Sequence, residues 1–227
     1  MRNAFHRVAV ILLLLLILVP VPTASAESKL AVAALSLPPG SDGLLHWRSG
    51  APETAEIQLS TRYFSEPMKM AGPVVQFFGD PVTADTDPVP EPLLSVSLPE
   101  APGTVYLVLW SAPGEDGKAQ WQSRLFRAAD WKMDSLKVLN GCSENLGMVA
   151  GNKKLPLARG KSFDFHLNDW KDSFPVKIYR ESKLERPVHS STWRVGQGRR
   201  ELCFLFDRGS AVAVRSLIDI PAPQPAP

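Results

Sequence analysis

The sequence predicts an all-β protein made of two small antiparallel β-sandwich domains of immunoglobulin-like type, arranged in tandem after a signal peptide. Three observations support this. Short segments in which apolar and polar residues alternate recur every 8 to 15 residues in the second half. Helix signals are scarce along the chain. About 200 residues remain after the signal peptide, which is the length of two such domains.

The first 26 residues have the three parts of a secretory signal peptide. Arg2 and Arg7 make a positively charged start, and Val8–Val19 is an apolar core of 12 residues, too short for the roughly 20 needed to cross a bilayer. Ala24-Ser25-Ala26 fits the cleavage pattern. We therefore expect export to the periplasm or the cell exterior, with no membrane insertion once the signal is removed.

Charge divides the exported chain into two parts. The full chain has 25 Lys and Arg against 23 Asp and Glu, and removal of the signal peptide takes away two arginines, which leaves 23 of each. Residues 27–131 carry a net charge of −6 and residues 132–227 carry +6. A neutral chain gives no support to nucleic-acid binding. The sign change indicates a domain boundary, and we predict domains at 27–130 and 131–219 with a disordered, Pro-rich tail at 220–227.

The first domain is expected to contain a hairpin formed by residues 104–112 and 119–127, with Asp116-Gly117 at its bend. Val105–Trp110 is apolar on both faces, so we expect this strand to be covered on its outer side by the second domain. The acidic, Pro-rich segment 80–92 is expected to be an extended surface loop. Further strands are predicted at residues 42–49, 54–60, 73–79 and 93–98.

The second domain shows clearer alternation. In "KSFDFHL", Phe163, Phe165 and Leu167 alternate with Asp164 and His166, as in a half-buried strand. The strands predicted for this half are residues 135–140, 161–167, 174–180, 190–196, 199–206 and 211–219.

The two cysteines, Cys142 and Cys203, both fall in the second domain. Export exposes them to an oxidising compartment, so we predict that they form a disulfide that closes a loop of about 62 residues and contributes roughly 4 kcal/mol. Free structural thiols and a reactive Cys142 are the alternatives. A nucleophilic Cys142 would need a base, for which His166 and His189 are candidates.

No catalytic or cofactor motif is present, and the three histidines of the exported chain have no metal-ligand spacing. We therefore assign no catalytic residue, no metal site and no cofactor.

Two polar segments are candidate binding sites. Trp170, between Asp169 and Lys171, stands in a polar turn where it would stack on a sugar ring or anchor a protein, unless it folds back over the edge of the sandwich. Four basic residues follow within ten positions and suit an anionic partner, although a solvated loop is the simpler interpretation; they are Lys177, Arg180, Lys183 and Arg186.

These observations favour an exported, non-catalytic binding or assembly module with a protein or glycan partner. A carbohydrate-binding protein that uses exposed loop aromatics is the first alternative. A hydrolase with a Cys- or His-based site is the second.

Overall fold

The computed structural model of the protein describes residues 27–99, 102–114, 119–208 and 211–220. The predicted signal peptide, the Asp116-Gly117 bend and residues 221–227 of the Pro-rich tail lie outside the described residues. Within the described residues, no helix is long and apolar enough to span a membrane.

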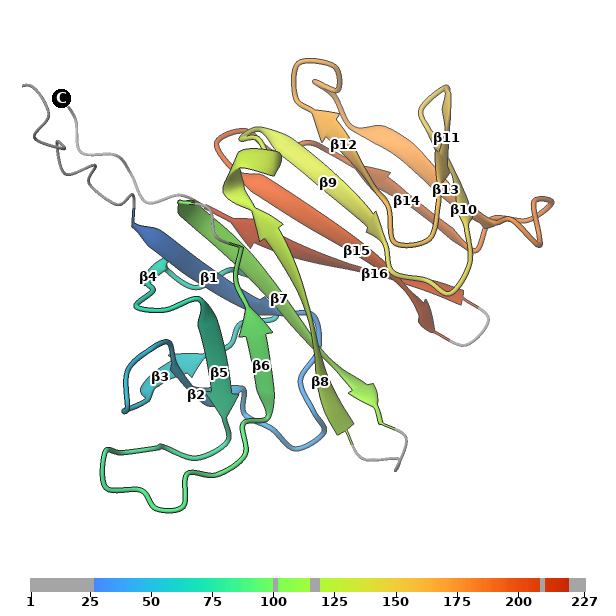
Figure 1. The fold of residues 1–227 in the computed structure, drawn as a ribbon. Coiled ribbons are helices and arrows are strands. Elements are labelled where there is room, and N and C mark those ends of the chain that lie inside the picture. Colours follow the sequence, from blue (N-terminus) through green and yellow to red (C-terminus); the bar gives the residue numbers. More distant parts are fainter. Residues whose placement is uncertain (1–26, 100–101, 115–118, 209–210, 221–227) are drawn as a thin grey trace, which may run out of the picture.

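The predicted all-β fold with two tandem sandwiches is confirmed (Figure 1). The strands of the first sandwich are β1 Ser28–Ala34, β2 Leu44–Arg48, β3 Ala55–Gln58, β4 Met68–Lys69, β5 Val74–Phe78, β6 Leu94–Ser97, β7 Gly103–Pro113 and β8 Ala119–Arg127. A 3-10 turn, η1 Ala128–Asp130, leads to the second sandwich. Its strands are β9 Ser135–Asn140, β10 Leu146–Ala150, β11 Lys153–Leu157, β12 Ser162–His166, β13 Phe174–Arg180, β14 His189–Trp193, β15 Arg200–Arg208 and β16 Ala211–Asp219.

The two sandwiches have the same topology. The sheets of the first have the strand orders β4-β1-β7-β8 and β3-β2-β5-β6. Adding eight to each strand number gives the sheets of the second, β12-β9-β15-β16 and β11-β10-β13-β14. The sheets are not purely antiparallel as predicted, because β1 pairs in parallel with β7, and β9 with β15. The protein is therefore a tandem pair of structural copies.

Four sheets stack with three apolar layers between them. One layer fills the first sandwich and a second fills the other. The third joins the β4-β1-β7-β8 sheet to the β12-β9-β15-β16 sheet and contains residues of both sandwiches, including Ala33, Val108, Leu139 and Phe204. The expected docking of the domains through the outer face of β7 is thus present. The boundary at residues 130 and 131 stays a prediction about which parts fold independently.

An aromatic cluster fixes the junction between the sandwiches. Trp131, directly after η1, is 1% exposed, and its ring centroid lies 5.2 Å from that of Tyr106 and 5.9 Å from that of Phe64. The Tyr106 hydroxyl donates to Asp219 at 2.7 Å, and the Arg200 guanidinium lies 5.3 Å from the Tyr106 ring. Each sandwich therefore contributes aromatic or charged groups to one contact.

Candidate functional site

A groove of about 560 Å3 lies on the outer face of the β11-β10-β13-β14 sheet. Its lining comes from β10, β11, β13 and the β13–β14 loop: Gly147, Met148, Val149, Lys154, Leu155, Pro156, Tyr179, Leu184 and Glu185. A hollow of about 290 Å3 continues it and shares Gly147, Pro156 and Leu184. We call this surface the outer groove.

Strand register explains which side chains line the outer groove. Leu146, Met148 and Ala150 point into the core, so Gly147 and Val149 face outward. Gly147 pairs with Pro156 on one side and Tyr179 on the other, which makes an apolar row across three strands. The next outward row is formed by Val149 between two exposed lysines, Lys154 and Lys177. An apolar row thus lies next to a cationic one, about 7 Å away along the strands.

Gly147 makes the groove possible because it contributes no side chain to the apolar row. A Cβ built at this position would lie 4.0 Å from Leu184 Cδ2 and 4.0 Å from Tyr179 Cβ, which is ordinary van der Waals contact. Its φ is not positive, so the backbone conformation does not require glycine. A Cβ is therefore accepted at position 147, and a longer side chain there would extend into the apolar row of the groove.

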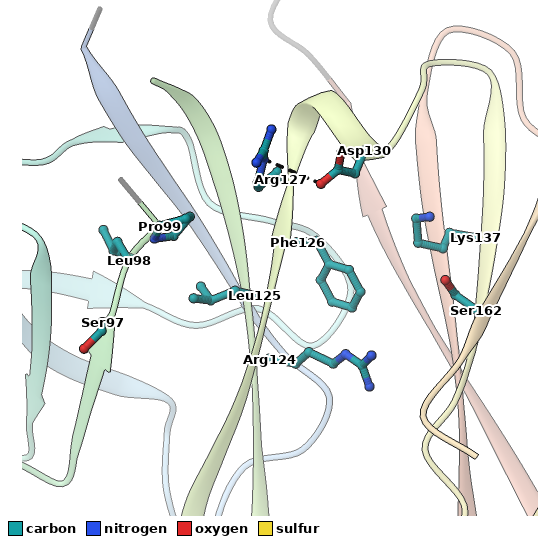
Figure 2. Close-up of a pocket in the computed structure, with 10 residues that line it drawn as sticks. All are labelled: Ser97, Leu98, Pro99, Arg124, Leu125, Phe126, Arg127, Asp130, Lys137 and Ser162. Atoms are coloured by element: carbon teal, nitrogen blue, oxygen red, sulfur yellow. Dashed lines mark ion pairs between the residues drawn. The ribbon is translucent and has the colours of Figure 1, made fainter. Parts of the chain in front are cut away.

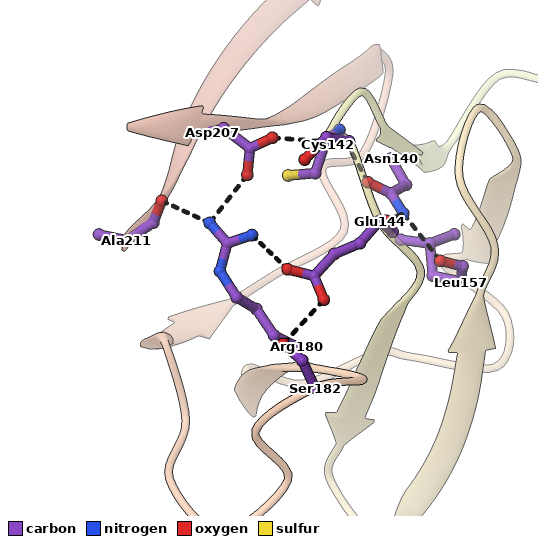
Figure 3. A network of polar contacts seen from close by, with 9 residues as sticks. Asn140, Cys142, Glu144, Leu157, Arg180, Ser182, Asp207 and Ala211 are labelled. Atoms are coloured by element: carbon purple, nitrogen blue, oxygen red, sulfur yellow. Dashed lines mark hydrogen bonds and ion pairs between the residues drawn. The ribbon is translucent and has the colours of Figure 1, made fainter. Parts of the chain in front are cut away.

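The β13–β14 loop forms one wall of the groove, and Leu184 on this loop is 65% exposed. An ion-pair network holds the base of the loop (Figure 3). The Arg180 guanidinium donates to Glu144 at 2.6 Å, to Asp207 at 2.8 Å and to the Ala211 carbonyl at 3.2 Å. The hydroxyl of Ser182 donates to the other oxygen of Glu144 at 3.0 Å. The loop therefore starts from an anchored position.

Electrostatics keep this network ionised. The hydrogen bond from Arg180 lowers the pKa of Glu144 below its ordinary value, although burial works against it. Burial would raise the pKa of Asp207, but hydrogen bonds from Ser143 and from Arg180 outweigh it, so the pKa is lowered. The hydrogen bonds from Arg180 to Glu144 and Asp207 in turn raise the pKa of Arg180. Arg180 is 8% exposed, and its guanidinium is paired with Glu144, Asp207 and the Ala211 carbonyl within the protein.

The predicted disulfide is not formed, and Cys142 and Cys203 are buried free thiols. Strand register gives the reason. Asn140 pairs with Leu205 in the parallel β9–β15 ladder, so Cys142 continues to the level of Asp207, four residues beyond Cys203. Four strand residues span about 13 Å, whereas the Cα atoms of a disulfide lie about 4.4–6.8 Å apart. The Sγ atom of Cys203 instead contacts the Ser216 hydroxyl at 3.1 Å.

The interpretation of Cys142 as a nucleophile is also disfavoured. Burial, with the negative charge of Asp207, raises the pKa of Cys142 to about 12, whereas a nucleophilic cysteine needs a lowered pKa. The His189 ring contacts Ser191 at 2.9 Å within β14, and His166 ends β12. Among the described residues, no cluster of three or more His, Cys, Asp or Glu side chains is arranged to hold a metal ion.

Trp170 lies against the end of the second core. Its ring centroid is 4.3 Å from that of Phe174 and 5.1 Å from that of Phe165, and Lys153 Nζ lies 5.0 Å from the ring centre. Trp170 is partly buried against the second core, and Lys153 lies over its ring. Asp169 and Lys171 are exposed on either side in the β12–β13 turn.

The candidate residues separate into two groups along β13. One group precedes the strand and contains Trp170, Asp169 and Lys171. Arg180 is the last residue of β13, whose two ends lie about 20 Å apart. Lys183 and Arg186 are exposed on the loop that also carries Leu184. Lys177 is the one candidate that belongs to the outward rows of the sheet beside the groove.

A second hollow of about 570 Å3 lies along the seam between the sandwiches, beside β8 (Figure 2). Arg124 crosses the seam and donates to the Gly160 carbonyl at 2.9 Å. Lys137 is paired with Asp164 at 2.8 Å, and Arg127 with Asp130 at 3.5 Å. The polar groups of the seam are therefore largely used within the protein.

The strands that form the floor of the outer groove, β10 and β11, are absent from the strands predicted above. The signal that would have found them is the dipeptide Gly151-Asn152 between "LGMVA" and "KKLPL", a two-residue hairpin pattern. Gly151 has φ +56°, as such a turn requires.

Comparison with known proteins gives two distant structural similarities. Neither the family models nor the curated proteins include a match to this chain. A solved structure described as "Alpha-glucan binding by a streptococcal virulence factor" aligns over 83% of this chain and 97% of its own, with 13% identity and a TM-score of 0.28. A product complex of the multi-modular glycogen-degrading pneumococcal virulence factor SpuA aligns over 85% of this chain and 22% of its own, with 13% identity and a TM-score of 0.29. Similarities at this level do not identify a function.

Proposed function

We propose that the chain is an exported, non-catalytic binding module that holds an extended segment of a protein partner in the outer groove. The observation that carries this proposal is the apolar row at Gly147, where a missing side chain leaves a hollow between Pro156, Tyr179 and Leu184. A concave apolar surface with an aromatic side chain is the usual anchor point of a protein interface. Export rests on the signal-peptide pattern of residues 1–26.

The two rows of the outer groove define the chemistry of the segment. An apolar side chain of the ligand fits over Gly147, against Pro156 and Tyr179. Lys154 and Lys177 lie one row further along and suit an acidic side chain. Because two residues of extended chain span about 6–7 Å, the preferred segment has an acidic residue two positions from an apolar one.

A peptide-display experiment on the immobilised chain tests this function. Random peptides should be enriched for sequences that carry an acidic residue two positions from a valine, leucine or proline. Gly147→Leu should abolish their binding because the leucine side chain fills the groove. Gly147→Ala is the matched control, since one methyl group leaves most of the hollow open, and it should retain most of the binding.

Charge reversal provides the second part of the test. Lys154→Glu with Lys177→Glu should weaken the selected peptides by at least about tenfold, with a larger loss at low salt. Enriched peptides that bind Gly147→Leu as well as the unmodified chain would overturn the proposal. Binding of a soluble glycan that is lost on Trp170→Ala would favour a carbohydrate-binding protein in its place.

A further inference from the structure

The first sandwich carries a segment with the chemistry that the outer groove selects. The β5–β6 connection, residues 79–93, is long and projects from the first sandwich (Figure 1), as the predicted extended surface loop. Loops of this length without strands of their own are uncommon and usually functional. Val82 is buried and its backbone bonds Thr54, which ties down the start of the loop. The later part is exposed, with Val89 at 48% and Leu93 at 49%.

The exposed part of this loop alternates proline with apolar and acidic residues. It reads Asp87-Pro88-Val89-Pro90-Glu91-Pro92-Leu93, so an acidic residue stands two positions from Val89 on each side. From Val89 to Leu93, proline at every second position favours an extended backbone and lowers the entropy lost on binding. Two residues of such a chain span about 6 Å, close to the separation of about 7 Å between the apolar and cationic rows of the outer groove.

Charge favours the same pairing. The half of the chain that carries the loop has a net charge of −6, and the half that carries the groove has +6. Asp85, Asp87 and Glu91 are exposed on the loop, while Lys154 and Lys177 are exposed beside the groove. Opposite charges on two extended surfaces accelerate encounter and fix orientation, even where each pair contributes little affinity.

The loop and the groove of one molecule do not face each other. The β5–β6 loop and the strands β10, β11 and β13 lie at opposite ends of the molecule in Figure 1. We propose that the β5–β6 loop of one copy binds in the outer groove of a second copy, with Val89 over Gly147 and Glu91, two positions further on, beside Lys154 and Lys177. This inference rests on the proposed function and names one occupant of the same groove.

Such a contact joins two different surfaces and leaves a free loop at one end and a free groove at the other. Repetition of the contact therefore produces a head-to-tail chain of copies or a closed ring. The wild-type protein should show a rise of sedimentation coefficient with concentration at low salt, and the rise should diminish at 1 M salt because the charges are then screened within about 3 Å.

Two variants that each lose one surface give the decisive test. Gly147→Leu keeps the loop and blocks the groove. Val89→Lys with Glu91→Lys keeps the groove and replaces the apolar residue and the acidic residue that this contact uses. Each variant alone should be monomeric in sedimentation velocity, at concentrations where the wild type associates. An equimolar mixture should form a dimer that does not grow further, because only one complementary contact exists between the two variants.

Controls separate this contact from general charge effects. Glu66→Lys reverses an exposed acidic residue of the first sandwich outside the loop and should associate like the wild type. Gly147→Ala should also associate. Association of either loss variant alone to the wild-type extent, or a mixture that stays monomeric, would overturn the inference.

The outcomes also separate this inference from the proposed function. A chain that selects peptides through Gly147 but stays monomeric at every concentration retains the function and refutes self-assembly. A synthetic peptide of residues 80–93 gives the direct measurement. It should bind the wild type and lose at least about tenfold in affinity for Gly147→Leu; equal binding to both would refute the inference as well.

Discussion

The two sandwiches share one topology but differ on their outer faces. In the first, the row that corresponds to Gly147 is occupied by His46, which pairs with Phe78 and is buried. The Arg48 guanidinium lies 5.0 Å from the Phe78 ring and donates to Gln76 at 2.9 Å. In the second, glycine occupies the middle strand, and the neighbouring Tyr179 borders an open groove. One face is closed by side chains and the other is open.

The open groove therefore depends on the residues at these positions and not on the topology, which the two sandwiches share. A histidine and an arginine close one face, whereas a glycine and a loop leucine leave the other concave. The two sheets that face each other across the seam show the same dependence on residues. Each carries apolar side chains on the face that points to the other sandwich, and these side chains form the third apolar layer. The same sheet framework supports a buried contact on one side and an open groove on the other.

The largest effect on the free energy of unfolding is expected at the junction of the two sandwiches. Trp131→Ala removes a buried ring that packs on Phe64 and Tyr106, and it should lower the free energy of unfolding by about 3–5 kcal/mol. Leu184→Ala, on the open face, should change it by no more than about 0.5 kcal/mol because Leu184 is exposed. Urea unfolding at pH 7 measures both.

The shape of the unfolding transition should change as well as its midpoint. Loss of Trp131 should separate the unfolding of the two sandwiches, so that fluorescence and circular dichroism no longer report one coincident transition. A small loss of stability with a single transition would show that the seam depends on the aliphatic residues instead.

Much of this fold could be predicted from the sequence, and the errors have physical causes. Strands with strict alternation, such as Phe174–Arg180, were found because one face is buried and the other exposed. β1 was missed. Its sequence "SKLAVAA" ends in an apolar run without alternation, since it lies between two core layers, and it comes soon after the predicted signal peptide. The parallel pairs were missed because pairing direction leaves no mark in a strand's own pattern.

The second prediction concerns the anchor of the groove wall. Arg180→Met leaves Glu144 and Asp207 without their cation and should lower the free energy of unfolding by about 2 kcal/mol. This is less than is typical for a fully buried pair, since both carboxylates are about one-third exposed. It should also weaken peptide binding, because the loop with Leu184 loses its fixed base. Lys183→Met, on the exposed part of the same loop, is the matched control for loss of one charge.

The effect of Arg180→Met should depend on pH. The pKa values of Glu144 and Asp207 are lowered in the folded state, so their contribution is present above their ordinary values near pH 4 and is lost as pH falls through the lowered values. The stability difference between wild type and variant should therefore be constant from pH 7 to about pH 5 and shrink below pH 4. A difference that grows on acidification would contradict this account of the network.

The candidate site could be predicted only in part. Lys177 was identified as a basic residue, and it does belong to the face beside the groove. Arg180 was grouped with it because the sequence shows charge but not direction, and an odd number of residues apart on a strand places two side chains on opposite faces. The groove itself depends on Gly147, and a missing side chain carries no sequence signal until the strands around it are known.

The third prediction concerns the thiols beneath the open face. Cys142 and Cys203 should resist alkylation at pH 8 in the native protein, because burial raises both pKa values to about 12, and both should react in denaturant without a reductant. Cys142→Ala should cost about 1 kcal/mol, well below the 2–5 kcal/mol expected for loss of a disulfide. Mass spectrometry after alkylation in denaturant should find two labels per chain. Zero labels would mean that Cys142 and Cys203 form a disulfide.

The smallest effect concerns the glycine that distinguishes the two outer faces. Gly147→Ala should raise the free energy of unfolding by about 0.4–1 kcal/mol, since alanine reduces the freedom of the unfolded chain and its methyl group makes ordinary contacts with Leu184 and Tyr179. The expected rise in melting temperature is about 1–4 °C. Gly160→Ala is the matched control, because Gly160 has φ +71° and alanine there should destabilise the protein. A rise in stability would show that the backbone of β10 does not require glycine at position 147. A loss of stability in Gly147→Ala would mean instead that the backbone of β10 requires glycine, and the open face would then be a consequence of folding.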